Sequence, residues 1–253
     1  MARGHNHGKG HGKGHGKGHG HGHRHHHGHD EGQDHQRSQE YAWEEEMAAF
    51  FLKQARFDAQ RRYPPIADRV KLLVEDVEEP LIVDLGCGPA LLLPELARAM
   101  PRARLVGIDP SGSMLELARR VIDEAGPGNY ELKAGKAEDI PLQDGSADVV
   151  ISLKNLHEWE DASGGMSEVV RVLRTGGILL LQDSNRGYPY WKLRLLVIWL
   201  RLTQRRITTH GYLGPYPDAY RPEQVETLLM KAGLAVEEAD PRSVELRYVA
   251  RRT

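Results

Sequence analysis

Short continuous apolar runs alternate with amphipathic segments through the middle of the chain. The apolar runs have the length and residue types of strands, and they cover residues 81–86, 104–109, 130–135, 147–153 and 177–184. Between them, apolar residues recur at helical spacing over 92–100, over 113–126 and in a segment that ends with 169–177. Strands of this kind that alternate with amphipathic helices are typical of a parallel sheet with helices on both faces. The pattern therefore predicts an α/β fold.

Two helices are expected before this alternating region. Residues 40–62 combine good helix formers with an apolar stripe, and Pro64 and Pro65 follow closely. Because proline lacks an amide hydrogen and clashes with the preceding turn, the pair is expected to end this helix. A second helix is then expected over residues 66–74.

The C-terminal part continues with one helix and two strands. Pro222 opens a helical pattern that runs through Met230, and Gly233 is its expected stop. The strands are expected over 235–240 and 244–250. The number of predicted strands is therefore seven, which a single domain of about 215 residues can bury.

The first 36 residues consist mostly of glycine and histidine, whereas residues 37–253 form the expected folded domain. Twelve of the 14 histidines lie in this tail, which has too little apolar surface to offset the entropy cost of folding and is expected to be disordered. A flexible chain of imidazoles can wrap Ni²⁺, Zn²⁺ or Cu²⁺ without a fixed geometry. The candidate metal ligands are His19, His21, His23, His25, His26 and His27. Metal buffering, recruitment or sensing is one interpretation, and a solvated extension with no selected role is the other.

The composition of the chain excludes several classes of protein. The net charge is −2, so the whole chain shows no preference for a polyanionic partner. The single cysteine, Cys87, excludes a disulfide framework. The N-terminus lacks the apolar core of a secretory signal, and the longest apolar run, 195–200, is too short to span a membrane. A cytoplasmic location is therefore expected.

The ends of the predicted strands carry the main chemical pattern of the sequence. The first strand leads into Asp84-Leu85-Gly86-Cys87-Gly88-Pro89-Ala90, where glycines allow a ligand to approach the backbone closely. A dinucleotide fingerprint needs a third glycine at the position of Leu91, so an NAD cofactor is not expected. The second strand ends at Asp109, 21 residues after Gly88. This spacing suits an acid that accepts hydrogen bonds from both hydroxyls of a ribose.

Four blocks of sequence resemble those of one enzyme family. They are D-x-G-x-G from Asp84, V-G-I-D-P-S ending at Ser111, A-E-D-I-P-L-x-D-G-S-A-D-V-V from Ala137, and L-x-x-G-G at Leu173–Gly177. In this order and spacing, over about residues 81–183, they resemble the class I S-adenosylmethionine (SAM)-dependent methyltransferases. The resemblance implies a Rossmann-like, seven-stranded and mostly parallel sheet with an antiparallel edge, and it implies SAM as the cofactor.

The resemblance also assigns cofactor contacts residue by residue. Asp84 matches the acid that orients the glycine loop and lies near the methionine ammonium of SAM, and Gly86 and Gly88 match the loop itself. Asp109 matches the acid that binds the ribose. The remaining matches are Ile108 and Pro110 beside the adenine, Lys136 and Ala137 at its edge, and Ser152 and Leu153 near the sulfonium.

Two positions depart from the pattern of the family. Ala90 stands where a third glycine is usual, which adds a methyl group near the cofactor. Lys136 replaces the usual Asp or Asn, so an acidic contact to the adenine amino group would have to come from Glu138 or Asp139. Ordinary turn chemistry at these strand ends is one alternative. A family member that has kept the fold and lost the cofactor is another.

His157 is the candidate catalytic residue. Methyl transfer from a sulfonium is a displacement in which the enzyme aligns the acceptor and excludes water, and a base is needed only for a protonated acceptor. A neutral imidazole can take that proton near pH 7. His157 follows the fourth strand, where the family places residues that face the acceptor. The alternative is that His157 packs or caps the start of a helix.

Two further residues bear on the chemistry. Asn155 lacks the N-P-P-Y context of enzymes that methylate nucleobase or glutamine amino groups, so this class of acceptor is less favoured. Cys87 is expected to be structural.

Residues 187–220 are expected to form a substrate lid and loop. On the helix that this segment predicts, Trp191, Leu195, Ile198 and Leu202 share one face, and Arg194, Arg201 and Arg205 share another. The favoured interpretation is a lid helix whose apolar side covers the pocket, which would imply a small and partly apolar acceptor. Peripheral contact of residues 191–205 with a membrane surface and a dimer contact are the alternatives.

The sequence therefore favours an enzyme that transfers a methyl group from SAM to a small-molecule acceptor, with its oligomeric state left open. The alternative from a different class is a protein that stores or recruits nickel, zinc or copper and uses the folded part as a scaffold. A protein or RNA acceptor is less favoured, because no basic or aromatic nucleic-acid platform is evident in the folded part.

Overall fold

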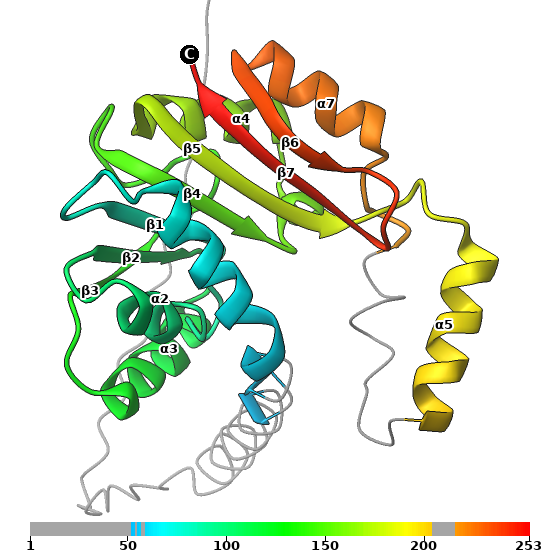
Figure 1. Ribbon diagram of the computed structural model, residues 1–253, viewed down its shortest axis with the longest axis horizontal. Helices are drawn as coiled ribbons and strands as arrows, with labels where there is room; N and C mark the ends of the chain where they lie inside the picture. The colour runs from blue at the N-terminus through cyan, green and yellow to red at the C-terminus, as the bar shows by residue number, and fades with distance from the viewer. Residues whose placement is uncertain (1–51, 54, 57–58, 204–215) are drawn as a thin grey trace, which may run out of the picture. The chain divides into compact units, whose positions relative to one another are not determined.

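Seven strands of the described residues form one sheet in the computed structural model (Figure 1). The structure describes residues 52–53, 55–56, 59–203 and 216–253. The strands are β1 (Leu81–Leu85), β2 (Arg104–Asp109), β3 (Tyr130–Ala134), β4 (Ala147–Leu153), β5 (Leu173–Ser184), β6 (Leu234–Asp240) and β7 (Glu245–Arg252). Their order across the sheet is β3-β2-β1-β4-β5-β7-β6.

The sheet is mostly parallel, with one strand reversed near its edge. All neighbours from β3 to β5 are parallel, whereas β7 is antiparallel to both β5 and β6. The strand order reverses at β1, between β2 and β4, and ligands of open α/β sheets bind beyond the carboxyl ends of the strands at such a point. The expected α/β fold with a seven-stranded, mostly parallel sheet is confirmed.

The helices that connect these strands are α2 (Leu93–Ala99), α3 (Gly112–Ala125), α4 (Ala162–Val172), α5 (Tyr190–Thr203) and α7 (Pro222–Lys231), with a short 3-10 helix, η1 (Leu156–Glu158). A further helix covers residues 59–73. The hydroxyl of Ser111 accepts a hydrogen bond from the backbone N–H of Met114 at the start of α3, which stabilises that end of the helix. None of the helices in these ranges has the length and hydrophobicity needed to cross a membrane.

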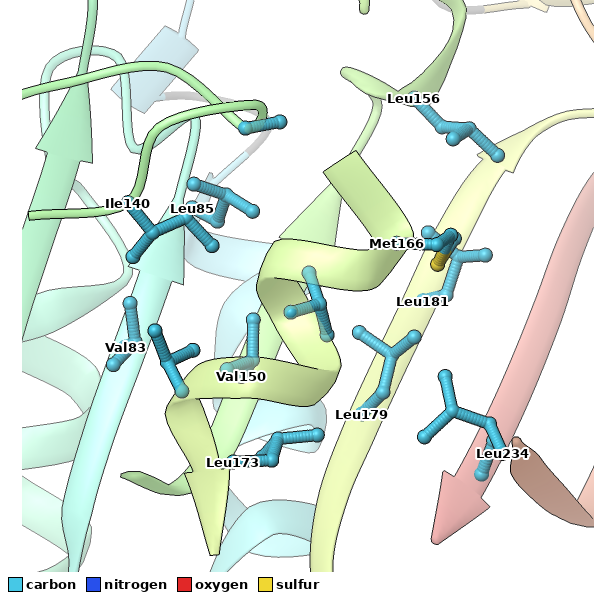
Figure 2. Close-up of a cluster of buried hydrophobic side chains, with 14 of the residues drawn as sticks. Val83, Leu85, Ile140, Val150, Leu156, Met166, Leu173, Leu179, Leu181 and Leu234 are labelled. Atoms are coloured by element: carbon cyan, nitrogen blue, oxygen red, sulfur yellow. The ribbon is translucent and has the colours of Figure 1, made fainter. Parts of the chain in front are cut away.

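Alternate side chains of each buried strand enter two cores, one on either face of the sheet. Ile82 and Val149 pack with the helix over residues 59–73 and with α2 and α3. Val83 and Val150 belong to the other core, with α4 and α7. Figure 2 shows this second core, in which Met166 of α4 lies close to the strand residues. Each fully buried aliphatic side chain contributes roughly 1.5–3 kcal/mol, so the two cores hold the carboxyl ends of the strands in register.

Pro64 and Pro65 lie inside the helix over residues 59–73, so the predicted break between two helices is wrong. The fixed φ of proline is compatible with helical backbone. The cost of each proline is a missing backbone hydrogen bond and a steric clash of its ring with the preceding turn. Ala67, Val70 and Val74 follow on the same helix and its end, and all three are buried against the sheet. Their burial offsets the cost of the two prolines, an effect of tertiary packing that local propensity does not include.

The helix predicted to include residues 169–177 as its last turns stops earlier than predicted. α4 ends at Val172, because Leu173 adopts extended backbone with ψ of 136°. Leu173 pairs with Ala147 of β4, so residues 173–177 begin β5 instead of ending the helix.

Candidate functional site

The loop after β1 is shaped by three residues with positive φ. Gly86, Gly88 and Ala90 have φ of 71°, 52° and 54°, a conformation that costs an alanine about 1–2 kcal/mol and a glycine little. The backbone N–H groups of Gly86 and Cys87 both donate to the carbonyl of Ile108, at 2.8 and 3.0 Å, which fixes the loop to the end of β2. A methyl group added at Gly88 would meet no atom within 4 Å. Open space therefore lies beside the backbone of Gly88.

Asp109, the last residue of β2, holds the same loop with its side chain. Its carboxylate accepts hydrogen bonds from the backbone N–H groups of Gly88, at 2.8 Å, and Ser111, at 2.9 Å. The backbone N–H of Gly135 donates to the Asp109 carbonyl at 3.3 Å, which brings the end of β3 to the same place. A carboxylate can accept about four hydrogen bonds, so Asp109 retains capacity for hydroxyl groups of a ligand.

Asn155, which follows β4, supports the glycine loop from the other side. Its side-chain amide donates to the carbonyl of Leu85 and accepts a hydrogen bond from the hydroxyl of Ser152. A methyl group added at Gly86 would lie 1.8 Å from Nδ2 of Asn155. Gly86 is therefore required both for its positive φ and for this close approach. Ser152, predicted to lie near the sulfonium, is fully buried, and its hydroxyl is used by Asn155.

Asp84 has a buried carboxyl group, and within the part of the chain that the structure describes no hydrogen bond to this group is found. Burial, with a smaller contribution from the charge of Asp109, raises the pKa of Asp84 from 3.8 to about 7. A bound cation would favour the ionised form and lower this pKa. Asp109 and Asn155 hold the glycine loop through direct hydrogen bonds, and the role expected of Asp84 in orienting the loop and binding the methionine ammonium stays a prediction.

The residues predicted to surround an adenine lie at the ends of β2 and β3 and differ in exposure. Pro110 is exposed, whereas Ala137 is buried in the core on the side of α4 and α7. Nζ of Lys136 lies 3.0 Å from a carboxylate oxygen of Glu160, and this hydrogen bond and charge raise the pKa of Lys136. Glu138 accepts a hydrogen bond from the backbone just before α4. The carboxylates of Glu138 and Glu160 therefore lie near Lys136, and both accept hydrogen bonds from other groups of the protein.

His157 lies in η1 with its ring against Asp183, near the end of β5. His157 Nδ1 is 2.8 Å from one carboxylate oxygen of Asp183, and the backbone N–H of His157 donates to the other oxygen at 3.2 Å. Burial by itself lowers the pKa of His157. The hydrogen bond and charge of Asp183, with the charges of Glu158 and Asp218, outweigh burial and place the pKa above its ordinary value of 6.5. When Asp183 accepts a hydrogen bond from Nδ1–H, the lone pair of Nε2 is the proton acceptor.

A buried ionic cluster centred on Glu245 lies at the same end of the sheet. One carboxylate oxygen of Glu245, the first residue of β7, is 2.8 Å from Nζ of Lys154 and 2.8 Å from the guanidinium of Arg62, and the other oxygen accepts from the amide of Gln182. Burial alone would raise the pKa of Glu245, but the charges of Lys154 and Arg62 outweigh it and lower this pKa. The cluster ties the helix over 59–73 to the ends of β4 and β5.

Neither a metal cluster nor a reactive thiol is found within residues 52–53, 55–56, 59–203 and 216–253. In these ranges no three or more His, Cys, Asp or Glu side chains are placed to hold a metal ion together. The predicted ligands, His19 to His27, lie outside the described residues. Cys87 is buried, and burial with the charges of Asp84 and Asp109 raises the pKa of its thiol, as a structural residue requires.

Known proteins are similar to this chain in sequence and in fold. A family model described as a methyltransferase domain matches residues 82–177. A demethylmenaquinone methyltransferase from Symbiobacterium thermophilum is 30% identical over 186 residues, which cover 67% of this chain and 73% of the relative. A fatty-acid O-methyltransferase from Mycolicibacterium smegmatis is 31% identical over 133 residues, which cover 52% of this chain and 47% of the relative. Across three curated relatives the chain spans 43% to 73% of the relative's own length.

Among solved structures, a SAM-dependent methyltransferase from Methanococcus maripaludis superposes with a TM-score of 0.62 at 20% identity, over 81% of this chain and 92% of the other. At this identity the likeness shows that the fold is shared. The match to the Symbiobacterium relative is stronger evidence of family membership, because it covers two thirds of the chain at 30% identity. Together with the glycine loop and the strand order, these matches show that the chain belongs to the class I SAM-dependent methyltransferases.

Proposed function

We propose that this methyltransferase moves a methyl group from SAM to a small-molecule acceptor that carries an apolar chain and loses a proton during the reaction. One observation supports the cofactor half of the proposal most strongly. The carboxyl group of Asp84 is buried, has no hydrogen-bond partner among the described residues and lies directly before the open glycine loop. A buried carboxylate of this kind is stabilised by a cation, and the methionine part of SAM carries one.

The residues at the ends of β1 and β2 fit the other parts of SAM. Asp109 retains hydrogen-bonding capacity for ribose hydroxyls, and the open space at Gly88 allows a ligand to lie against the backbone. In this proposal Pro110, Lys136 and Ala137 border the adenine. SAM supplies a methyl group on an electrophilic sulfonium, so the chain itself has only to orient the acceptor, exclude water and accept a proton.

His157 and Asp183 divide the acid–base chemistry in the proposal. Asp183 holds Nδ1 of the imidazole and stabilises its charged form, while Nε2 of His157 receives the proton that the acceptor loses. The ring and carboxylate are both largely buried, with 9% and 2% of their side chains exposed, so water competes little for either group. Asp183 thus acts as a positioning residue for His157.

The apolar chain of the acceptor is proposed from the relatives. One relative is named for demethylmenaquinone and another for fatty acids, and both compounds join a reactive polar group to a long apolar chain. A carboxylate has no proton to lose before it is methylated, whereas a phenolic hydroxyl or an activated ring carbon of a quinol does. The buried His157–Asp183 pair therefore favours a quinol-type acceptor over a carboxylate.

Transfer of methyl-labelled SAM by the full chain, with demethylmenaquinol or with a long-chain fatty acid as acceptor, tests this proposal. We expect label in the quinol, and we expect His157→Ala to lower the rate by at least about 100-fold while the variant still binds SAM. Label in the fatty acid and not in the quinol, at equal rates for the unchanged protein and His157→Ala, would show that the reaction uses a carboxylate acceptor and needs no base at His157. Transfer to neither acceptor would overturn the proposed acceptor class.

A further inference from the structure

One face of α5 exposes several large apolar side chains. Trp191, Leu195, Ile198, Trp199 and Leu202 are between 50% and 79% exposed. The opposite face is buried through Leu193, Val197 and Leu200. The apolar face that was expected to close over the pocket is therefore open to solvent in this structure. Large contiguous exposed apolar patches are rare on soluble monomers and mark interaction surfaces, whereas single exposed apolar residues do not.

Basic side chains flank this exposed face on both sides. At about 100° per residue, Lys192 and Arg194 fall on opposite edges of the stripe that Trp191, Leu195 and Ile198 form. Nζ of Lys192 lies over the ring of Trp191, 5.5 Å from its centroid, which places this cation beside the apolar face. An apolar face with cations on both edges matches a surface that is apolar inside and anionic at its rim.

The segment around α5 is also free of acidic residues. No Asp or Glu occurs between Ser184 and Pro217, although the chain has 36 acidic residues in all. The same segment contains Arg186, Lys192, Arg194, Arg201, Arg205 and Arg206. Two of the four tryptophans of the chain are on α5, and both are exposed. Tryptophan, leucine and basic residues in this arrangement are typical of helices that lie in the interface of an anionic membrane.

We propose that the exposed face of α5 binds the surface of an anionic bilayer, with Trp191, Trp199 and Leu202 at the depth of the headgroups. A two-fold contact between the α5 helices of two copies is less favoured, because it would place the same cations opposite one another with no acid in the segment to pair with them. Membrane binding extends the proposed function. Its purpose rests on that function: an acceptor with a long apolar chain resides in the bilayer, and α5 would bring the enzyme to the acceptor.

Flotation of the full chain with lipid vesicles tests the inference. We expect binding to vesicles of 30% phosphatidylglycerol in phosphatidylcholine, weaker binding at high salt, and little binding to pure phosphatidylcholine. The paired substitution Trp191→Ser and Leu202→Ser removes apolar contact, and Lys192→Glu with Arg194→Glu reverses the flanking charges. Each pair is expected to lower binding by more than tenfold.

Matched controls separate α5 from general surface effects. Leu72→Ser with Met230→Ser removes equally exposed apolar groups elsewhere, and Arg119→Glu with Lys231→Glu makes the same charge change outside α5. Both control pairs are expected to bind vesicles like the unchanged protein. No binding of the full chain, equal loss in the controls, or an α5-dependent dimer that binds no vesicle would overturn the inference. Calorimetry with SAM is expected to give the same affinity for all four variants, so failure of membrane binding is distinguishable from failure of the proposed function.

Discussion

Nδ1 of His157 lies 2.8 Å from a carboxylate oxygen of Asp183, and the backbone N–H of His157 donates to the other oxygen of the same carboxylate. The backbone N–H of Ser184 also donates to Asp183, at 2.6 Å. These contacts hold the imidazole in one orientation and one tautomer before any acceptor binds. A histidine held in this way differs from one that only packs a helix start, and the difference can be measured.

Asp183→Asn is expected to lower kcat by about 10- to 100-fold, because the imidazole loses the charge that stabilises its protonated form. The pKa of His157 is expected to fall, since Asp183 is what raises it against burial. The base acts in its neutral form, so the acidic limb of the kcat/KM profile should move to lower pH. Glu158→Gln, at an exposed side chain, is the control and should move the limb much less. An unchanged pH profile for Asp183→Asn would show that His157 is not the base.

Asp84→Asn is expected to stabilise the cofactor-free protein at pH 8. The folded-state pKa of about 7 lies above the unfolded value of 3.8, so ionised Asp84 destabilises the fold, and stability is lost as the pH rises from about 4 to 7. Removing this charge should raise the free energy of unfolding by roughly 1–3 kcal/mol at pH 8 and change it little at pH 4. Thermal unfolding at both pH values measures this, with the exposed Asp123→Asn as control. A lower melting temperature for Asp84→Asn at pH 8 would contradict the prediction that ionised Asp84 destabilises the cofactor-free protein.

Gly86→Ala and Gly88→Ala should separate folding from cofactor binding. A methyl group at Gly86 collides with Asn155 and sits at positive φ, so this variant should lose about 3 kcal/mol or more of stability. At Gly88 the added methyl group meets only open space, and the φ penalty of about 1–2 kcal/mol leaves the protein folded. Urea denaturation and SAM titration of both variants test this. We expect Gly88→Ala to fold and bind SAM more weakly, and equal destabilisation of the two variants would refute the geometry of the loop.

Glu245→Gln should destabilise the fold by about 3–5 kcal/mol, because it leaves the cations of Lys154 and Arg62 beside a neutral group in a buried place. The ion pair of Glu238 with Arg69 is exposed, so Glu238→Gln should cost less than about 1 kcal/mol. Because the pKa of Glu245 is lowered on folding, its contribution is present above the unfolded pKa of 4.5 and is lost as the pH falls below it. Urea denaturation of both variants at pH 7 and pH 4 checks the magnitude and its direction.

The sheet could be predicted from the sequence because each strand is marked locally. The run over 147–153 coincides with β4, and the other strand boundaries differ from the prediction by a few residues at most. The exceptions arise where packing or pairing decides the outcome. Pro64 and Pro65 remain in a helix because distant strands bury its far side, and Leu173 joins β5 because Ala147 is there to pair with it.

The site could be predicted only as far as it follows the strand ends. Asp84, Gly86, Gly88 and Asp109 stand in motifs that a single sequence displays. The contact of Asn155 with Leu85 joins residues 70 positions apart, and that of Arg62 with Glu245 joins residues 183 apart. His157, in η1 after β4, and Asp183, near the end of β5, are 26 positions apart, and the adjacency of β4 and β5 in the sheet brings them together. The sequence shows which acidic and amide residues follow strands. It does not show which of them lie next to one another, because that depends on the order of the strands in the sheet.

Calorimetric titration of SAM into the full chain and into Asp84→Asn at pH 7.5 tests whether this chain binds SAM through the buried carboxyl group of Asp84. The unchanged protein should bind one SAM per chain, and Asp84→Asn should bind at least about tenfold more weakly while remaining folded, because the buried contact to the ammonium group is lost. A full chain that does not bind SAM would contradict the proposed cofactor, and an Asp84→Asn protein that binds SAM as tightly as the unchanged one would contradict the proposed role of Asp84.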